Sequence, residues 1–196
     1  MIKKLSLLFF FFSSFYVFSI NYDSSDSVEF FEKPSKPLIV LFVGDRVVGR
    51  TSFFDSLKNR EFRSETPSSM DTELYFLKCD IGRYIQYMSV PTDFLRIFAK
   101  ADAYVLCYDL SSTDSLIFAL QWYRSKSLKN KVILLGLKSD EIKNPQLEKN
   151  YIDKQIKEIF PDFHYNDHFV FSNKRREGLE KIKQAIHNFF IRSAFF

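Results

Sequence analysis

The residues best suited to do chemistry lie in a glycine-containing stretch directly after an apolar run. The stretch reads Gly44-Asp45-Arg46-Val47-Val48-Gly49-Arg50-Thr51-Ser52 and follows residues 38–43. It matches the phosphate-binding pattern G-x-x-x-x-G-K-[ST] at every position except Arg50, which stands in the place of lysine. The glycines of such a loop let backbone N–H groups point at phosphate oxygens, and the helix that follows adds its positive end. Thr51 would offer its hydroxyl to a Mg²⁺ ion bound between phosphates.

Arg50 leaves the strength of phosphate binding open. Lysine acts in this position as a compact point charge, whereas arginine has a larger, planar head with five donors. Either the guanidinium displaces phosphate, or it binds phosphate in an altered pose.

The loop lies within a regular alternation of apolar and amphipathic segments. Apolar runs occupy residues 38–43, 74–79, 84–88, 103–108, 132–136 and 169–171, and helical patterns occupy 51–58, 115–125, 151–160 and 179–190. Continuous apolar runs are typical of strands buried on both faces of a parallel sheet. A turn signal at residues 80–83 predicts a hairpin between the second and third runs. We therefore predict a three-layer α/β fold with a six-stranded, mostly parallel sheet and one antiparallel edge strand.

Three further segments strengthen the interpretation of the loop. They are Ala101-Asp102-Ala103 continuing to Tyr108-Asp109, with Ser115 and Trp122 beyond; Leu137-Lys138-Ser139-Asp140 after the fifth run; and Ser172-Asn173-Lys174 after the sixth. Together with Asp45 and Val48, these segments resemble the Ras-superfamily small GTPases, and the Rab-like members in particular. The resemblance covers residues 38–190 and implies a small-GTPase fold of the phosphate-loop class.

The resemblance also implies roles for individual residues. Asp140 would accept guanine N–H groups, the stem of Lys138 would lie along the base, and backbone N–H groups of residues 172–174 would cap the guanine oxygen. Phe62 falls where an aromatic ring packs against the base. The implied ligands are GTP or GDP, with Mg²⁺ if binding is retained. The metal would be held by Thr51 and either Ser69, counted from Thr51, or Thr66, counted back from Ser89. The implied nucleotide-binding set is Gly44, Asp45, Val48, Gly49, Arg50, Thr51, Ser52, Phe62, Lys138, Asp140, Ser172, Asn173 and Lys174.

The chain departs from the family pattern where hydrolysis would occur. Ser89 stands in the place of the aspartate that holds the Mg²⁺ water shell, Thr92 in that of a glycine, and Asp93 in that of the glutamine that orients water. A carboxylate beside a triphosphate suffers like-charge repulsion, so Asp93 is a poor general base and we assign no catalytic residue. Leu137 also replaces the asparagine of the base-recognition motif. We expect weakened nucleotide binding and slow or absent GTP hydrolysis.

The N-terminus carries a different signal. Met1-Ile2-Lys3-Lys4 precedes a Phe-rich apolar run that ends at Ile20. A basic start and a run of this length are typical of a signal peptide, with a membrane anchor as the alternative. We expect residues 1–20 to be such a segment, residues 21–37 to be a linker, and residues 38–192 to be the GTPase-like domain. Lys3 and Lys4 before the run, with acidic residues after it, predict that the N-terminus stays in the cytosol and the rest of the chain crosses the membrane.

Composition excludes several other functions. The net charge of +4 is no nucleic-acid signature, and the two cysteines, Cys79 and Cys107, lie inside apolar runs as small core residues. We expect a monomer that acts as a recognition or regulatory module, with effector or regulatory proteins as partners and membrane contact through residues 1–20. Two alternatives stay open, namely a working Rab-type switch and a secreted or lumenal binding protein built on a GTPase scaffold. The predicted location is the secretory pathway or a membrane, with the cytoplasm as the alternative.

Overall fold

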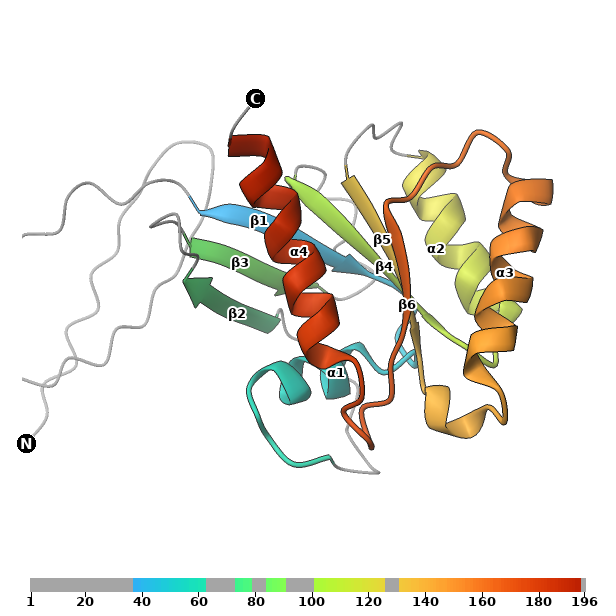
Figure 1. Ribbon diagram of the computed structural model, residues 1–196, viewed down its shortest axis with the longest axis horizontal. Helices are drawn as coiled ribbons and strands as arrows, with labels where there is room; N and C mark the ends of the chain where they lie inside the picture. The colour runs from blue at the N-terminus through green and yellow to red at the C-terminus, as the bar shows by residue number, and fades with distance from the viewer. Residues whose placement is uncertain (1–36, 63–72, 79–83, 91–100, 126–130, 195–196) are drawn as a thin grey trace, which may run out of the picture. The chain divides into compact units, whose positions relative to one another are not determined.

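A six-stranded sheet organises the domain (Figure 1). The computed structural model describes residues 37–62, 73–78, 84–90, 101–125 and 131–194, all within the compact unit Ser35–Phe196. The strands follow the order β2-β3-β1-β4-β5-β6, with β2 antiparallel to β3 and the other pairs parallel. Their bounds are β1 Leu38–Val43, β2 Glu73–Lys78, β3 Tyr84–Ser89, β4 Ala103–Asp109, β5 Lys131–Leu137 and β6 Asp167–Val170. This confirms the predicted mixed sheet with one antiparallel edge strand.

Helices cover both faces of the sheet, and two hydrophobic clusters show which helix covers which face. Phe53 of α1 (Arg50–Leu57) and Ile182 of α4 (Leu179–Ala194) pack with alternate strand residues in one cluster. Leu120 of α2 (Thr113–Ser125) and Ile156 of α3 (Pro145–Ile159) pack with the intervening strand residues in the other. Because successive strand side chains point to opposite faces, apolar runs such as β4 serve both clusters at once. The predicted three-layer architecture is therefore confirmed.

The observed ends of the helices differ in part from the prediction. The helix expected over 151–160 begins at Pro145, because proline has its φ preset for a first helical turn and lacks only an N–H that would have no partner inside the helix. In α4 the predicted core positions Leu179, Ile182 and Ile186 are buried. The side chains of residues 189–194, and with them Phe189 and Phe190, lie outside the described part.

Other predictions concern segments that the structure does not describe. They include residues 1–36, with the predicted signal or anchor and most of the linker, and Cys79. Cys107 is fully buried in β4, as expected. Within the described ranges, no helix combines the length and the apolar character needed to span a bilayer.

Candidate nucleotide site

The predicted phosphate loop connects β1 to α1 at the end of a central strand. Gly44 must be glycine because a Cβ atom there would lie 2.4 Å from the backbone oxygen of Cys107 in β4. Gly49 has a φ of 96°, which glycine adopts without steric cost. Its carbonyl oxygen accepts the N–H of Phe53 at 3.0 Å and so begins the helix. The strand, loop and helix thus have the order that phosphate binding requires.

The remaining loop residues divide between core and surface. Val48 is fully buried in the cluster that contains α1. The Asp45 side chain accepts the backbone N–H of Arg46 at 2.7 Å. Thr51 and Ser52 are half-buried in the first turn of α1. Thr51 therefore lies where the sequence placed it, at the start of the helix.

Arg50 is directed into the domain. Its Nη1 donates to the carbonyl oxygen of Val90 at 2.8 Å, and lies 3.4 Å from both the Ser89 hydroxyl and the Phe42 carbonyl oxygen. The residue is only 7% exposed. Its guanidinium therefore lies at the carboxyl ends of β1 and β3, which pair in register at Phe42 and Ser89.

The positive charge of Arg50 affects the pKa of Cys107 in the neighbouring strand β4. Burial raises the pKa of the Cys107 thiol to about 12, and the positive charge of Arg50 opposes this rise. Cys107 is therefore a neutral core thiol. The sequence shows that Arg50 departs from the phosphate-loop motif, but no sequence pattern predicted that its side chain points into the domain.

The predicted base-recognition segment follows β5. Leu137 is the last residue of that strand and is fully buried, so an apolar side chain fills the place of the family's asparagine. Lys138 has a φ of 58°, and its Nζ forms an ion pair with Asp109 Oδ2 at 2.7 Å. Burial would raise the pKa of Asp109, but hydrogen bonds from Lys138 and Ser111 outweigh it and hold the pKa below its ordinary value. A carboxylate at the end of β4 thus fixes Lys138.

The loop after β6 connects the other two segments. The Ser172 hydroxyl donates to Asp140 Oδ1 at 2.7 Å, and Asn173 Nδ2 donates to the carbonyl oxygen of Gly49 at 3.2 Å. Ser172 and Asn173 are both buried. The segments that begin at Gly44, Leu137 and Ser172 therefore form one hydrogen-bonded arrangement at the carboxyl ends of β1, β5 and β6.

Two contacts in this arrangement were missed from the sequence. We assigned residues 172–174 a role through their backbone, yet the Asn173 side chain holds the phosphate loop. Asp109 belongs to the segment that resembles Rab-like proteins, but its pairing with Lys138 was not predicted. Lys174 is exposed in the turn, and Phe62, beyond the end of α1, is 44% exposed. Their predicted contacts with the base stay predictions.

The described donors do not fit a Mg²⁺ ion at the end of β3. Mg²⁺ prefers six oxygen ligands, usually with carboxylates among them. Ser89 supplies a neutral hydroxyl where a carboxylate is expected, and a guanidinium nitrogen lies 3.4 Å from that hydroxyl. No cluster of three or more histidine, cysteine or acidic side chains suited to a metal occurs among the described residues. Ser69, Thr66, Thr92 and Asp93 lie outside them.

Comparison with known proteins extends this picture at the level of the fold. Neither the protein-family models nor the curated proteins contain a match to this sequence. A solved structure of Roco2 RocCORdC from Methanosarcina barkeri, bound to GDP, superposes with a TM-score of 0.64 at 22% identity. The match covers 85% of this chain and 52% of that one, so the chain spans about half the length of its neighbour. The domain has the fold of a phosphate-loop GTPase.

Proposed function

We propose that this domain binds guanine nucleotides with reduced affinity, hydrolyses GTP slowly or not at all, and acts as a recognition or regulatory module. The observation that supports this most directly is the hydrogen bonding of Ser172 to Asp140 and of Asn173 to Gly49. These two contacts connect the base-recognition and phosphate segments into one preformed site. The solved neighbour with this fold is a GDP complex.

Guanine is the base that best fits the Asp140 carboxylate. The Ser172 hydroxyl occupies one of its oxygens and fixes its orientation, and an ionised carboxylate only accepts hydrogen bonds. Guanine presents two adjacent N–H donors to such a group, whereas adenine does not. Leu137 removes the amide that would add a further hydrogen bond, at a cost of about 0.5–1.5 kcal/mol. The expected result is guanine specificity with reduced affinity.

Weak hydrolysis follows from the residues at the end of β3. Phosphoryl transfer depends almost entirely on positioning and on neutralising charge around the phosphates. Ser89 lacks the charge of an aspartate, and the Arg50 guanidinium is bound to the Val90 carbonyl. Neither residue supplies the usual metal-binding or phosphate-binding group. A module that recognises partners in one nucleotide-bound state is consistent with this loss.

A working Rab-type switch is the second candidate. Gly44, Gly49, Thr51, Lys138 and Asp140 keep the family's residue types, and Lys138 and Asp140 are held by Asp109 and Ser172. Such a switch requires both nucleotide binding and measurable GTP turnover. A single-turnover measurement of GTP hydrolysis therefore separates it from the first candidate.

Calorimetric titration of the full chain with GDP and ADP tests the proposed binding. We expect ADP to bind at least about tenfold more weakly, because hydrogen bonds to a charged group contribute about 1.5–3 kcal/mol. Asp140→Asn should lose GDP and favour xanthosine diphosphate, since an amide donates to the oxygen that xanthine has in place of the amino group. Glu141→Gln, an exposed neighbour, is the matched control and should bind GDP normally. No heat with GDP, or equal affinities for GDP and ADP, would contradict the proposal.

A further inference from the structure

The position of the Arg50 guanidinium is the unusual feature of this site. A phosphate-loop protein holds Mg²⁺ between the loop hydroxyl and an aspartate near the end of a neighbouring strand. In this chain that hydroxyl belongs to Thr51, and the strand β3 ends at Ser89. The adjacent residue Arg50 extends to the same strand end, where Nη1 reaches the Val90 carbonyl at 2.8 Å and the Ser89 hydroxyl at 3.4 Å. A protein cation therefore lies beside the residue that replaces the metal-binding aspartate.

The two departures from the motif, Arg50 in place of lysine and Ser89 in place of aspartate, complement each other. An aspartate at position 89 would bring a negative charge that a metal could neutralise, and serine removes that charge. A guanidinium in contact with the serine adds a fixed positive charge where a divalent cation would otherwise be attracted. A guanidinium and a divalent cation placed close together repel each other strongly inside a protein, where the dielectric constant is low. The site thus disfavours Mg²⁺ through both the lost carboxylate and the added guanidinium.

We propose that the Arg50 guanidinium takes the place of the divalent cation, so that the chain binds a nucleoside diphosphate without requiring a metal. Arg50 is the first residue of α1, so its charge adds to the positive end of the helix that follows the phosphate loop. The Phe42, Ser89 and Val90 oxygens hold it in place. Arginine keeps its charge at every physiological pH, so the positive charge at this strand end is permanent.

This inference rests on the proposed function, and one experiment separates the two. GDP is titrated into the full chain in buffer with excess Mg²⁺ and in buffer with EDTA. We expect the two dissociation constants to differ by less than about threefold, equivalent to under 1 kcal/mol. A larger loss of affinity in EDTA would overturn the inference and leave the proposed function intact. No GDP binding in either buffer would instead overturn the proposed function, and the inference with it.

A paired variant tests the two residues directly. Arg50→Lys combined with Ser89→Asp restores the residue types of a metal-dependent loop. With GDP present, this variant should bind Mn²⁺ measurably by electron paramagnetic resonance, and EDTA should lower its GDP affinity by at least about tenfold. The native chain should show no bound Mn²⁺ under the same conditions. Stoichiometric Mn²⁺ on the native chain with GDP would overturn the inference, and this measurement does not depend on the folding of the variant.

Discussion

At the scale of single residues, the site combines positions that the backbone demands with positions that have changed. Gly44 and Gly49 are required by a close approach to β4 and by a positive φ, independent of any ligand. Leu137 and Arg50 stand where the small-GTPase motifs have asparagine and lysine; Leu137 fills the core and Arg50 contacts the end of β3. The loop therefore has the backbone geometry of a phosphate loop, while the side chains at Arg50 and Leu137 differ from those of the motifs.

Gly44→Ala tests the close approach of the loop to β4. The new Cβ would lie 2.4 Å from a backbone oxygen, so the loop or the strand must shift. We expect a loss of about 1–3 kcal/mol in the free energy of unfolding, as for other overpacked sites, together with weaker GDP binding. Urea denaturation and calorimetry measure the two effects.

Gly178→Ala provides the control for this change. Gly178, directly before α4, also has a positive φ. A Cβ there would lie 3.7 Å from its nearest neighbour, the backbone oxygen of Val170. This variant should lose stability, because alanine disfavours that backbone conformation, and yet keep native GDP affinity. Native stability and native GDP affinity for Gly44→Ala would show that the loop does not approach β4 so closely.

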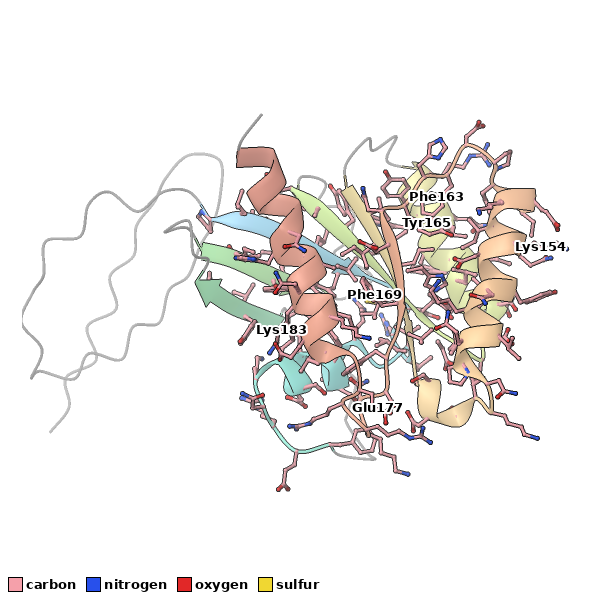
Figure 2. All side chains as sticks on the ribbon, viewed as in Figure 1. Lys154, Phe163, Tyr165, Phe169, Glu177 and Lys183 are labelled. Atoms are coloured by element: carbon pink, nitrogen blue, oxygen red, sulfur yellow. The ribbon has the colours of Figure 1, made fainter. Side chains whose placement is uncertain are left out.

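At the scale of elements, a partly buried polar network connects α3 to β4 and β6 on the face opposite α1 and α4. Asp153 Oδ1 accepts hydrogen bonds from Tyr165, whose position Figure 2 shows, and from His168 Nδ1, both at 2.6 Å. Lys149 pairs with Oδ2 at 2.8 Å. Because the carboxylate only accepts, His168 donates from Nδ1 and its Nε2 accepts the Tyr108 hydroxyl at 2.6 Å. Side chains from α3, β4, β6 and the segment before β6 thus share one network.

The network makes stability depend on pH. Burial lowers the pKa of His168 from its ordinary 6.5, outweighing the opposing effect of Asp153, with Lys149 adding to the lowering. The unfolded chain therefore takes up a proton more readily, and the native state loses stability as pH falls below about 6.5. We expect urea unfolding to give a smaller free energy at pH 5.5 than at pH 7.5, and His168→Gln to reduce that difference.

The exposed His164 offers the matched control for this prediction. His164→Gln should keep the native pH dependence. The assignment would be contradicted if the free energy of unfolding changed between pH 5.5 and 7.5 by the same amount in His168→Gln as in the native chain.

Burial would raise the pKa of Asp153, but hydrogen bonds from Lys149, Tyr165 and His168 outweigh it and lower the pKa below 3.8. That contribution is present above pH 3.8 and is lost only at more acid pH, outside the window tested.

At the scale of the whole molecule, the segments proposed for nucleotide binding and for hydrolysis lie at the ends of different strands of the sheet. The loops at the carboxyl ends of β1, β5 and β6 are held together by Ser172 and Asn173. At the end of β3, where the motif for hydrolysis would lie, Ser89 contacts Arg50. Binding and turnover are therefore expected to be uncoupled in this protein.

Single-turnover GTP hydrolysis measures that separation. With excess protein and Mg²⁺, we expect phosphate release below about 10⁻⁴ per second, because the sequence has Ser89, Thr92 and Asp93 where the small-GTPase motif has aspartate, glycine and glutamine. Protein heated to unfolding and incubated in parallel gives the background rate. Turnover at the rate of an ordinary small GTPase would contradict the proposed loss of hydrolysis and favour the working switch.

The sequence by itself determined the class of fold and the place of the glycine-containing loop within it. Apolar runs of strand length and helical periodicity are local signals, and the glycine spacing after 38–43 is a local requirement of a phosphate loop, so both can be recognised without knowing which segments meet. The mixed sheet, the buried core of α4 and the loop between β1 and α1 were predicted on these grounds.

Only the tertiary structure decided how the unusual residues are used. The direction of Arg50 depends on carbonyl oxygens at the ends of two different strands, that of Phe42 in β1 and that of Val90 after β3, which lie 8 and 40 residues from it in sequence. The Asp109–Lys138 pair and the contact of Asn173 with Gly49 join segments 29 and 124 residues apart, which no local pattern encodes. A side chain with several donors takes its direction from the acceptors that folding brings near it, and those acceptors are known only once the strands are in register.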